Sequence, residues 1–239
     1  MSLTHAETLE ATVRVLTRNG LEVHLTAGQG CCGALNTHAG EPDSAIEMAK
    51  KNIDSFLSAN PDAIVSASAG CGAAMKDYGE LFRDEGEYAE RAKKVADLTR
   101  DIHELLVEYD FEPPAGMLDV TVTYQDPCHL LNAQRITEAP RQILSSIPGL
   151  KLVELGEPAI CCGSAGTYSI TQREMSARLG KRKARNVIAT GAEIVATGNP
   201  GCAMQLDFAL RQIANDESGE PTTKVRYVVD LLDAAYALD

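Results

Sequence analysis

The sequence predicts an α/β fold of two pseudo-repeated units, each a small parallel sheet flanked by helices, with cysteine loops at the carboxyl ends of the strands. A Gly-Cys-Cys-Gly motif at residues 30–33 has a counterpart, Ile-Cys-Cys-Gly, at residues 160–163, so the two Cys-Cys pairs are 130 residues apart. Each copy is followed about 40 residues later by a Gly-Cys pair, at residues 70–71 and 201–202. Predicted strands and helices alternate through both parts, which is typical of a parallel sheet.

The first unit is predicted to cover residues 1–112. Its opening helix has Leu9, Val13 and Leu16 at helical spacing and ends at Asn19 and Gly20, residue types that accept a left-handed backbone. A proline-rich break at residues 111–116 closes the unit. The predicted elements are, in order, a helix at 6–18, a strand at 21–25, the loop of Cys31 and Cys32, a helix from 41 to about 59, a strand at 63–66, a helix that begins around Cys71, and a long amphipathic helix at 87–108.

The second unit is predicted to cover residues 117–239. Asp126 and Pro127 are interpreted as the N-cap and first residue of a helix, so Cys128 would lie in the first turn, where the helix dipole favours a thiolate. Asn199 and Pro200 repeat this arrangement before the last cysteine. The predicted elements are a strand at 120–124, a helix from 126 to about 148, a strand at 151–155, the loop of Cys161 and Cys162, a helix at 171–190, a strand at 193–197, the turn of Cys202, and a closing helix at 225–238.

Every cysteine in this scheme follows a strand. Because the carboxyl ends of parallel strands meet at one edge of a sheet, the four cysteines of the second unit are expected to converge there as metal ligands. They are Cys128, Cys161, Cys162 and Cys202. The first unit has Cys31, Cys32 and Cys71, and the counterpart of Cys128 would fall just ahead of Met1. Either an upstream segment was lost or removed, or the first site is degenerate.

Composition narrows the function classes. Seven cysteines, an odd number with two adjacent pairs and no secretion signal, indicate metal ligands or redox thiols rather than structural disulfides. A net charge of −12 argues against nucleic acid as a partner. Without an 18-residue apolar run or a signal-peptide pattern, we expect a cytoplasmic protein that meets membranes only through partners. Four thiolates suit either zinc or an iron-sulfur cluster.

The repeated pattern of Cys, Cys-Cys-Gly and Gly-Cys resembles the cysteine-rich CCG-domain family. The resemblance is carried by residues 28–35, 68–72, 124–130 and 197–202 and covers nearly the whole chain. It is strongest to the C-terminal part of the glycolate oxidase iron-sulfur subunit, with lactate-utilisation subunits and the cysteine-rich subunit of heterodisulfide reductase as further relatives. This resemblance implies a [4Fe-4S] cluster in the second unit, with a second cluster in the first unit left open, and a role in electron transfer.

The chain also departs from these relatives. It has no Cys-x-x-Cys-x-x-Cys motif of the ferredoxin-like domain that such iron-sulfur subunits usually carry, so a separate ferredoxin-like subunit is an expected partner. Ala74 and Gln205 stand where the full family motif has a further cysteine, which weighs against the disulfide chemistry of heterodisulfide reductase.

The resulting hypothesis is an electron-transfer subunit that accepts electrons from a flavoprotein oxidising a 2-hydroxy acid such as glycolate or lactate. No flavin or nicotinamide motif of the Gly-x-Gly-x-x-Gly type follows a strand, so no catalytic residue is assigned. His129, beside Cys128, is expected near the site rather than as a ligand. Two alternatives stay open: a thiol-disulfide redox subunit like that of heterodisulfide reductase, and a zinc-binding interaction subunit.

Overall fold

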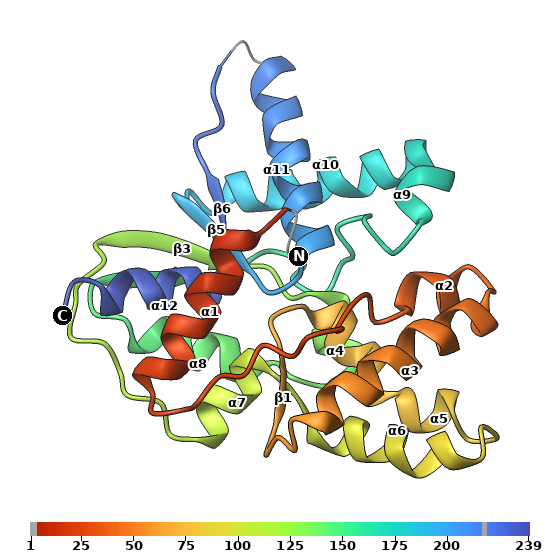
Figure 1. Cartoon of the computed structure of the whole chain (residues 1–239). Helices are drawn as coiled ribbons and strands as arrows, with labels where there is room; N and C mark the ends of the chain where they lie inside the picture. Colours follow the sequence, from red (N-terminus) through yellow and green to blue (C-terminus); the bar gives the residue numbers. More distant parts are fainter. Residues whose placement is uncertain (1–3, 217–218) are drawn as a thin grey trace.

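The computed structural model describes residues 4–216 and 219–239 and contains two small parallel sheets flanked by helices (Figure 1). The predicted α/β class is confirmed. The larger sheet has the strand order β4-β3-β5-β6, and the smaller one pairs β1 with β2. The strands are β1 (Ile64–Ser66), β2 (Thr99–Asp101), β3 (Val120–Tyr124), β4 (Leu150–Val153), β5 (Ile194–Thr197) and β6 (Lys224–Tyr227).

The larger sheet is built around β3, which is parallel to a neighbour on each side. Val122 pairs with Leu152 of β4 on one side and with Ile194 of β5 on the other. The carboxyl ends of β4, β3 and β5 therefore lie at one edge. Its helices are η1 (a π-helical turn, His129–Ala133), α8 (Glu138–Ser146), α9 (Tyr168–Thr171), α10 (Arg173–Ala189), α11 (Pro200–Asp216) and α12 (Val228–Tyr236).

The smaller sheet belongs to the first part of the chain, where the predicted helices at 6–18 and from 41 onward are confirmed. Pro42 occupies the first turn of α3, as its fixed φ favours. The helices of this part are α1 (Ala6–Arg18), α2 (Ala34–His38), α3 (Pro42–Ser58), α4 (Ala69–Lys76), α5 (Tyr78–Leu81), α6 (Glu87–Leu98) and α7 (Ile102–Glu108).

The strand predicted at residues 21–25 is wrong. These residues have no regular structure, and the Leu25 side chain is 76% exposed. Neither sheet offers them a neighbour, because the strands of the described residues pair only among β1 to β6. A segment with alternating apolar residues but no partner leaves its backbone groups to water, so the alternation alone does not make a strand.

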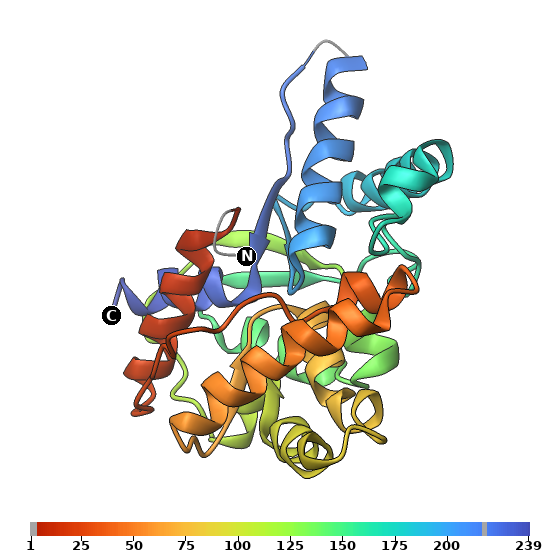
Figure 2. The ribbon, with the colours of Figure 1, turned by 45° about the vertical axis from the view of Figure 1, so that its right-hand side comes forward.

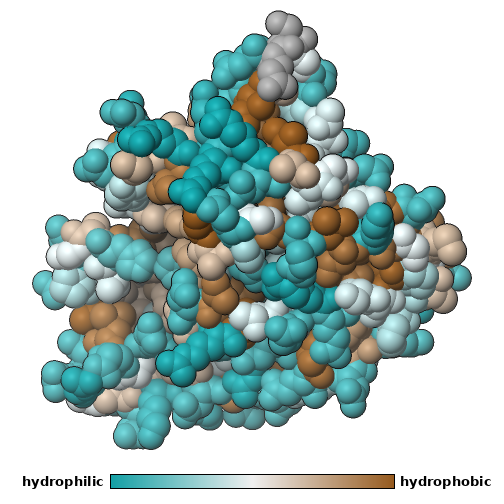
Figure 3. Space-filling model, turned by 180° about the vertical axis from the view of Figure 1, so that it is seen from behind, coloured by the Kyte–Doolittle hydropathy of each residue, from teal (hydrophilic) through white to brown (hydrophobic). Residues whose placement is uncertain are grey.

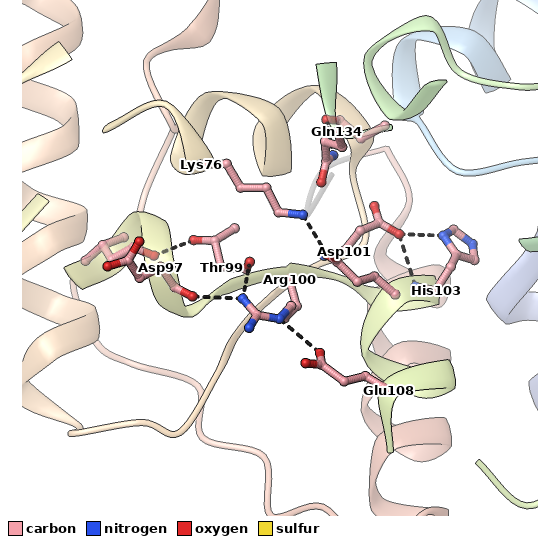
Figure 4. A network of polar contacts seen from close by, with 11 residues as sticks. Lys76, Asp97, Thr99, Arg100, Asp101, His103, Glu108 and Gln134 are labelled. Atoms are coloured by element: carbon pink, nitrogen blue, oxygen red, sulfur yellow. Dashed lines mark hydrogen bonds and ion pairs between the residues drawn. The ribbon is translucent and has the colours of Figure 1, made fainter. Parts of the chain in front are cut away.

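The single helix predicted at residues 87–108 is also wrong, because β2 interrupts it. Thr99 pairs with Ile64 of β1, so these residues extend the smaller sheet. Asp101 then starts α7: its carboxylate accepts a hydrogen bond from the His103 backbone, and Glu104 reaches back to the Asp101 N–H in a capping box. Figure 4 shows this turn, in which the Nδ1 of His103 also lies 2.6 Å from the Asp101 carboxylate.

The helix predicted from residue 126 to about 148 forms in two pieces. The π-helical turn η1 is followed by a break in which Arg135 has a left-handed backbone with φ of +58°, and α8 begins after it. The Asp126 side chain is not the cap that was predicted. It instead forms a paired hydrogen bond with Arg141, 2.8 Å at each oxygen. The fold therefore directs this carboxylate to a residue fifteen positions away.

The closing helix predicted at residues 225–238 begins with a strand. Val225 pairs with Val195 of β5, and the alternation of buried and exposed side chains along β6 matches an edge strand. The helix proper, α12, starts at Val228 after Tyr227. Its first turn contains Asp230, whose carboxylate accepts a hydrogen bond from the Tyr227 backbone 3.1 Å away.

One hydrophobic core draws on both parts of the chain. Helix α1 packs against α12, so segments from opposite ends of the sequence lie side by side in both ribbon views (Figures 1 and 2). Helix α7 of the first part packs against α8 of the second. On the surface of the first pair, Arg14 donates to Asp233 at 3.0 and 2.7 Å. Buried residues of this core include Val15, Leu16, Ile102, Leu105, Ile143, Leu144, Leu231 and Leu232.

The surface seen from behind is mostly hydrophilic, with hydrophobic residues in small groups (Figure 3). Exposed large apolar side chains include Met117 on the stretch before β3, and Met204 and Phe208 on α11. Among the described residues, no helix has the length and apolar character needed to cross a membrane.

Candidate metal centre

The four cysteines of the second half meet at the edge of the larger sheet. Cys128 follows β3, Cys161 and Cys162 follow β4, and Cys202 lies in the first turn of α11 after β5. The pKa of Cys161 depends on its neighbours Cys128 and Cys162, and that of Cys162 depends on Cys161 and Cys202, so these thiols are electrostatically coupled. The three adjacent strands thus bring together side chains that are far apart in the sequence.

These four thiols are free and largely shielded from water. Cys162 and Cys202 are buried, whereas Cys128 and Cys161 are partly exposed. The neighbouring Cys128 thiol, followed by that of Cys162, lowers the pKa of Cys161, and the neighbouring Cys161 raises the pKa of Cys128. Crowded thiols cannot all ionise without a compensating cation, because each thiolate disfavours the next. A bound cation would reduce this repulsion between thiolates.

The three cysteines of the first half are arranged differently. The neighbouring Cys32 thiol lowers the pKa of Cys71 to about 6, while Cys31 is exposed. The carbonyl of Cys32 accepts a hydrogen bond of 2.9 Å from the buried Tyr78 hydroxyl. The first half therefore presents a pair of interacting thiols with a third cysteine at the surface.

Within residues 4–216 and 219–239, no group of three or more His, Cys, Asp or Glu side chains is arranged to hold a metal ion. The four thiols of the second half influence one another's pKa values in sequence, from Cys128 through Cys161 and Cys162 to Cys202. Ligation by these cysteines, and by the three of the first half, stays a prediction.

Each Cys-Cys loop turns at a glycine with a left-handed backbone, Gly33 with φ of +83° and Gly163 with φ of +91°. A Cβ on Gly163 would lie 2.5 Å from the carbonyl oxygen of Ser176 on α10, and one on Gly33 would lie 3.0 Å from that of Ala45 on α3. The Gly163 N–H donates to the Cys161 sulfur over 3.3 Å. Only glycine permits both the turn and this close approach of the following helix.

We expect Gly163→Ala to destabilise the fold more than Gly28→Ala. Both glycines have φ of +91°, so alanine costs about 1–2 kcal/mol of backbone strain at either position. A Cβ at Gly28 would meet no atom within 4 Å, whereas one at Gly163 would meet the Ser176 carbonyl, which should add about 1–3 kcal/mol. Urea unfolding of the metal-free variants measures the difference. Equal losses would mean that the α10 backbone moves aside freely.

Asn199 joins the two cysteine sites. Its side-chain carbonyl accepts a hydrogen bond of 3.1 Å from the Gly70 N–H, one residue before Cys71, and its amide donates to the Cys202 sulfur over 3.6 Å. The Ala69 N–H donates to the Gly198 carbonyl at 3.0 Å beside it. The sequence indicated Asn199 only as a cap for its own helix, so this contact across the two halves was missed.

His129 lies beside the site, as expected, with its Nδ1 3.7 Å from the Cys128 sulfur. Its ring stacks on that of His38 from α2, with ring centres 5.7 Å apart. Burial, and then the neighbouring His38, lowers the pKa of His129. His38 reaches the second site from the first half of the chain. Nothing in its sequence position signals that, because the contact depends on how the halves pack.

A family model matches residues 1–76 and 122–207, more than half of the chain, and its description is CCG, cysteine-rich domain. The chain belongs to the CCG cysteine-rich domain family. The matched ranges contain all seven cysteines.

Curated relatives agree with this assignment. The chain is 38% identical over 207 residues to a probable glycolate oxidase iron-sulfur subunit of Bacillus subtilis, covering 86% of this chain and 47% of the relative. It is 32% identical to the glycolate oxidase iron-sulfur subunit of Escherichia coli, covering 94% and 53%. It is 30% identical to lactate utilization protein A of Shouchella clausii, covering 93% and 90%. This CCG-domain chain thus spans about half the length of the glycolate oxidase relatives but nearly all of the lactate utilization protein.

Proposed function

We propose that Cys128, Cys161, Cys162 and Cys202 hold a [4Fe-4S] cluster and that the chain is an electron-transfer subunit of a complex that oxidises a 2-hydroxy acid. The observation that carries this proposal is the placement of four free thiols after three adjacent strand ends, where each influences the pKa of its neighbour. The names of the relatives, which are iron-sulfur subunits of glycolate oxidase, support the same class of protein.

The donor set fits an iron-sulfur cluster. Such clusters are held by cysteine thiolates, and the sulfurs here come with backbone N–H groups close by, as in the contact from Gly163 to Cys161. Hydrogen bonds to the sulfurs, charge and solvent exposure set the potential of a bound cluster. Cys162 and Cys202, at 2% and 4% exposure, would shield one side of it, while the partly exposed Cys128 and Cys161 face toward the surface. When bound, the cluster would supply one-electron transfer.

We also propose that the chain consists of two pseudo-repeated units, residues 1–112 and 117–239, with the complete site in the second. Supporting this, Cys71 and Cys202 occupy the same place, the first turn of the helix after β1 and after β5. Cys31, Cys32 and Cys71 would provide three ligands for a second cluster. A fourth ligand for that cluster would have to come from elsewhere.

The partner that the proposal requires is a flavoprotein that oxidises glycolate or lactate, because this oxidation releases two electrons, which a flavin can accept together and pass to a one-electron carrier one at a time. A separate ferredoxin-like subunit would carry electrons onward. Membrane association would then occur through partners, and the chain itself would act in the cytoplasm.

The test begins with anaerobically purified protein reconstituted with iron and sulfide. Iron and acid-labile sulfide in equal amounts are expected, and zinc without sulfide would instead indicate a zinc-binding interaction subunit. Alone, the chain should not reduce a dye with glycolate or lactate. With the flavoprotein and the hydroxy acid, the cluster should become reduced. Oxidation of the cluster by a disulfide substrate, without reduction through the flavoprotein, would point to the thiol-disulfide alternative.

A further inference from the structure

Lys183 on α10 is fully buried beneath the second Cys-Cys loop, with an exposed fraction of 0%. Its ammonium donates to the carbonyl oxygens of Glu157 and Pro158, 2.8 and 3.0 Å away, in the segment between β4 and Cys161. Among the buried side chains of residues 4–216 and 219–239, Lys183 is the only lysine or arginine. A lysine this deep in a protein normally has a specific partner for its charge.

No carboxylate supplies that partner within the described part of the chain. The ion pairs there do not include Lys183, and the two carboxylates that interact electrostatically with it, Asp126 and Glu157, are already paired with Arg141 and Arg182. Burial lowers the pKa of Lys183. The opposite effect, a raised pKa, comes from Cys162, then Asp126, Cys202 and Cys161. An unpaired buried charge is costly, so the groups that can balance this one are chiefly the thiols of the candidate metal centre.

The first half has a neutral residue in the corresponding place. Asn52 on α3 is buried under the first Cys-Cys loop, where it accepts a hydrogen bond of 2.7 Å from the Gly30 N–H and donates to the Cys31 carbonyl at 2.9 Å. Asn52 and Lys183 are 131 residues apart, the same spacing as Cys71 and Cys202. Both side chains form hydrogen bonds between the following helix and the backbone of the segment that contains or precedes the Cys-Cys pair, but only Lys183 brings a positive charge.

We propose that Lys183 is the built-in counter-charge of the second cysteine site, stabilising its anionic metal-bound form and raising the reduction potential of the cluster held there. The proposal rests on the function proposed above for that site. Reduction adds a negative charge to the cluster, and a fixed cation in a low-dielectric interior favours the more negative state. Asn52 provides no such charge, so the two cysteine sites differ in electrostatics as well as in ligand number.

The test compares Lys183→Gln and Lys183→Met with Lys181→Met in reconstituted protein. Gln removes the charge and keeps a hydrogen-bond donor for the loop, whereas Met removes both. Lys181 lies on the same helix, is partly exposed and pairs with the exposed Asp216, so its substitution controls for a change in net charge. The readouts are the midpoint potential of the cluster and the rate at which bound metal is lost to a chelator.

Both Lys183 variants are expected to shift the potential downward and to lose metal faster than wild type, while Lys181→Met leaves both unchanged. Faster loss in Lys183→Met alone would show that the hydrogen bonds matter and the charge does not, which overturns the proposal. A potential and a metal-loss rate in Lys183→Gln equal to wild type would overturn it as well. The metal content of wild type decides the proposed function separately: zinc in place of iron refutes the cluster, yet the metal-loss rates still test the counter-charge. A wild-type chain that binds no metal overturns both.

Discussion

Replacing Cys161 with serine is expected to remove nearly all of the iron from the reconstituted chain, whereas Cys31→Ser should leave most of it in place. The pKa of Cys161 depends on both Cys128 and Cys162, which places it centrally among the four thiols, while Cys31 is at the surface of a site with only three cysteines. Changes to residues that merely support a ligand cost about 10- to 100-fold in metal affinity, so loss of a central ligand should cost at least as much.

The measurement is iron per chain after anaerobic reconstitution and desalting, with far-UV circular dichroism to show that each variant is folded. The two variants are matched: each replaces the first cysteine of a Cys-Cys-Gly sequence with serine. Equal loss of iron from both would contradict the proposed inequality of the sites. It would indicate one cluster shared by the two halves, or a further ligand such as His5, the residue just before α1.

The placement of the cysteines after neighbouring strand ends could be predicted from the sequence because it follows from topology. Once the segments before Cys128, Cys161 and Cys202 are assigned as parallel strands of one sheet, their carboxyl ends must share an edge. Hydrophobic alternation and turn residues were sufficient for that assignment. No knowledge of side-chain packing was needed.

The errors arose where a strand depends on a partner far away in the sequence. Residues 21–25 alternate as a strand does, yet stay irregular without a neighbour, while residues 99–101 form a strand inside an apparently helical pattern because β1 is there to pair with them. The capping box from Asp101 to Glu104 was a local signal for the start of α7 that the longer periodicity obscured. A segment forms a strand only when a neighbouring strand is present to pair with it, and the local sequence pattern carries no information about that neighbour.

The supporting residues of the site could not be predicted, for a related reason. Asn199 contacts Gly70 across the two halves, and Lys183 is buried only because α10 lies over the loop before Cys161. The sequence of an amphipathic helix does not distinguish a buried lysine from an exposed one, because burial depends on the elements that pack against the helix. Comparison of the two halves after folding is what identifies Lys183 and Asn52 as corresponding residues.

A second large effect is expected from Arg141→Leu, which should destabilise the metal-free chain by about 3 kcal/mol. Arg141 donates to both oxygens of Asp126 at 2.8 Å, and its guanidinium lies 5.0 Å from the centre of the Tyr124 ring. Asp126 is only 6% exposed, so removing the arginine leaves a carboxylate buried without its partner. Because Asp126 is two residues before Cys128, metal binding should weaken too.

Two further variants separate this explanation from a general loss of surface charge pairs. Arg141 also contacts Glu154, which is 66% exposed, so Glu154→Gln should cost less than about 1 kcal/mol. Adding Asp126→Asn to Arg141→Leu removes the buried charge and should recover part of the stability, since a neutral amide is less costly to bury than an unpaired carboxylate. Urea unfolding measures all four proteins. If the double variant is no more stable than Arg141→Leu alone, the loss comes from the packing of the arginine on Tyr124, and the ion pair is not what holds the turn that carries Cys128.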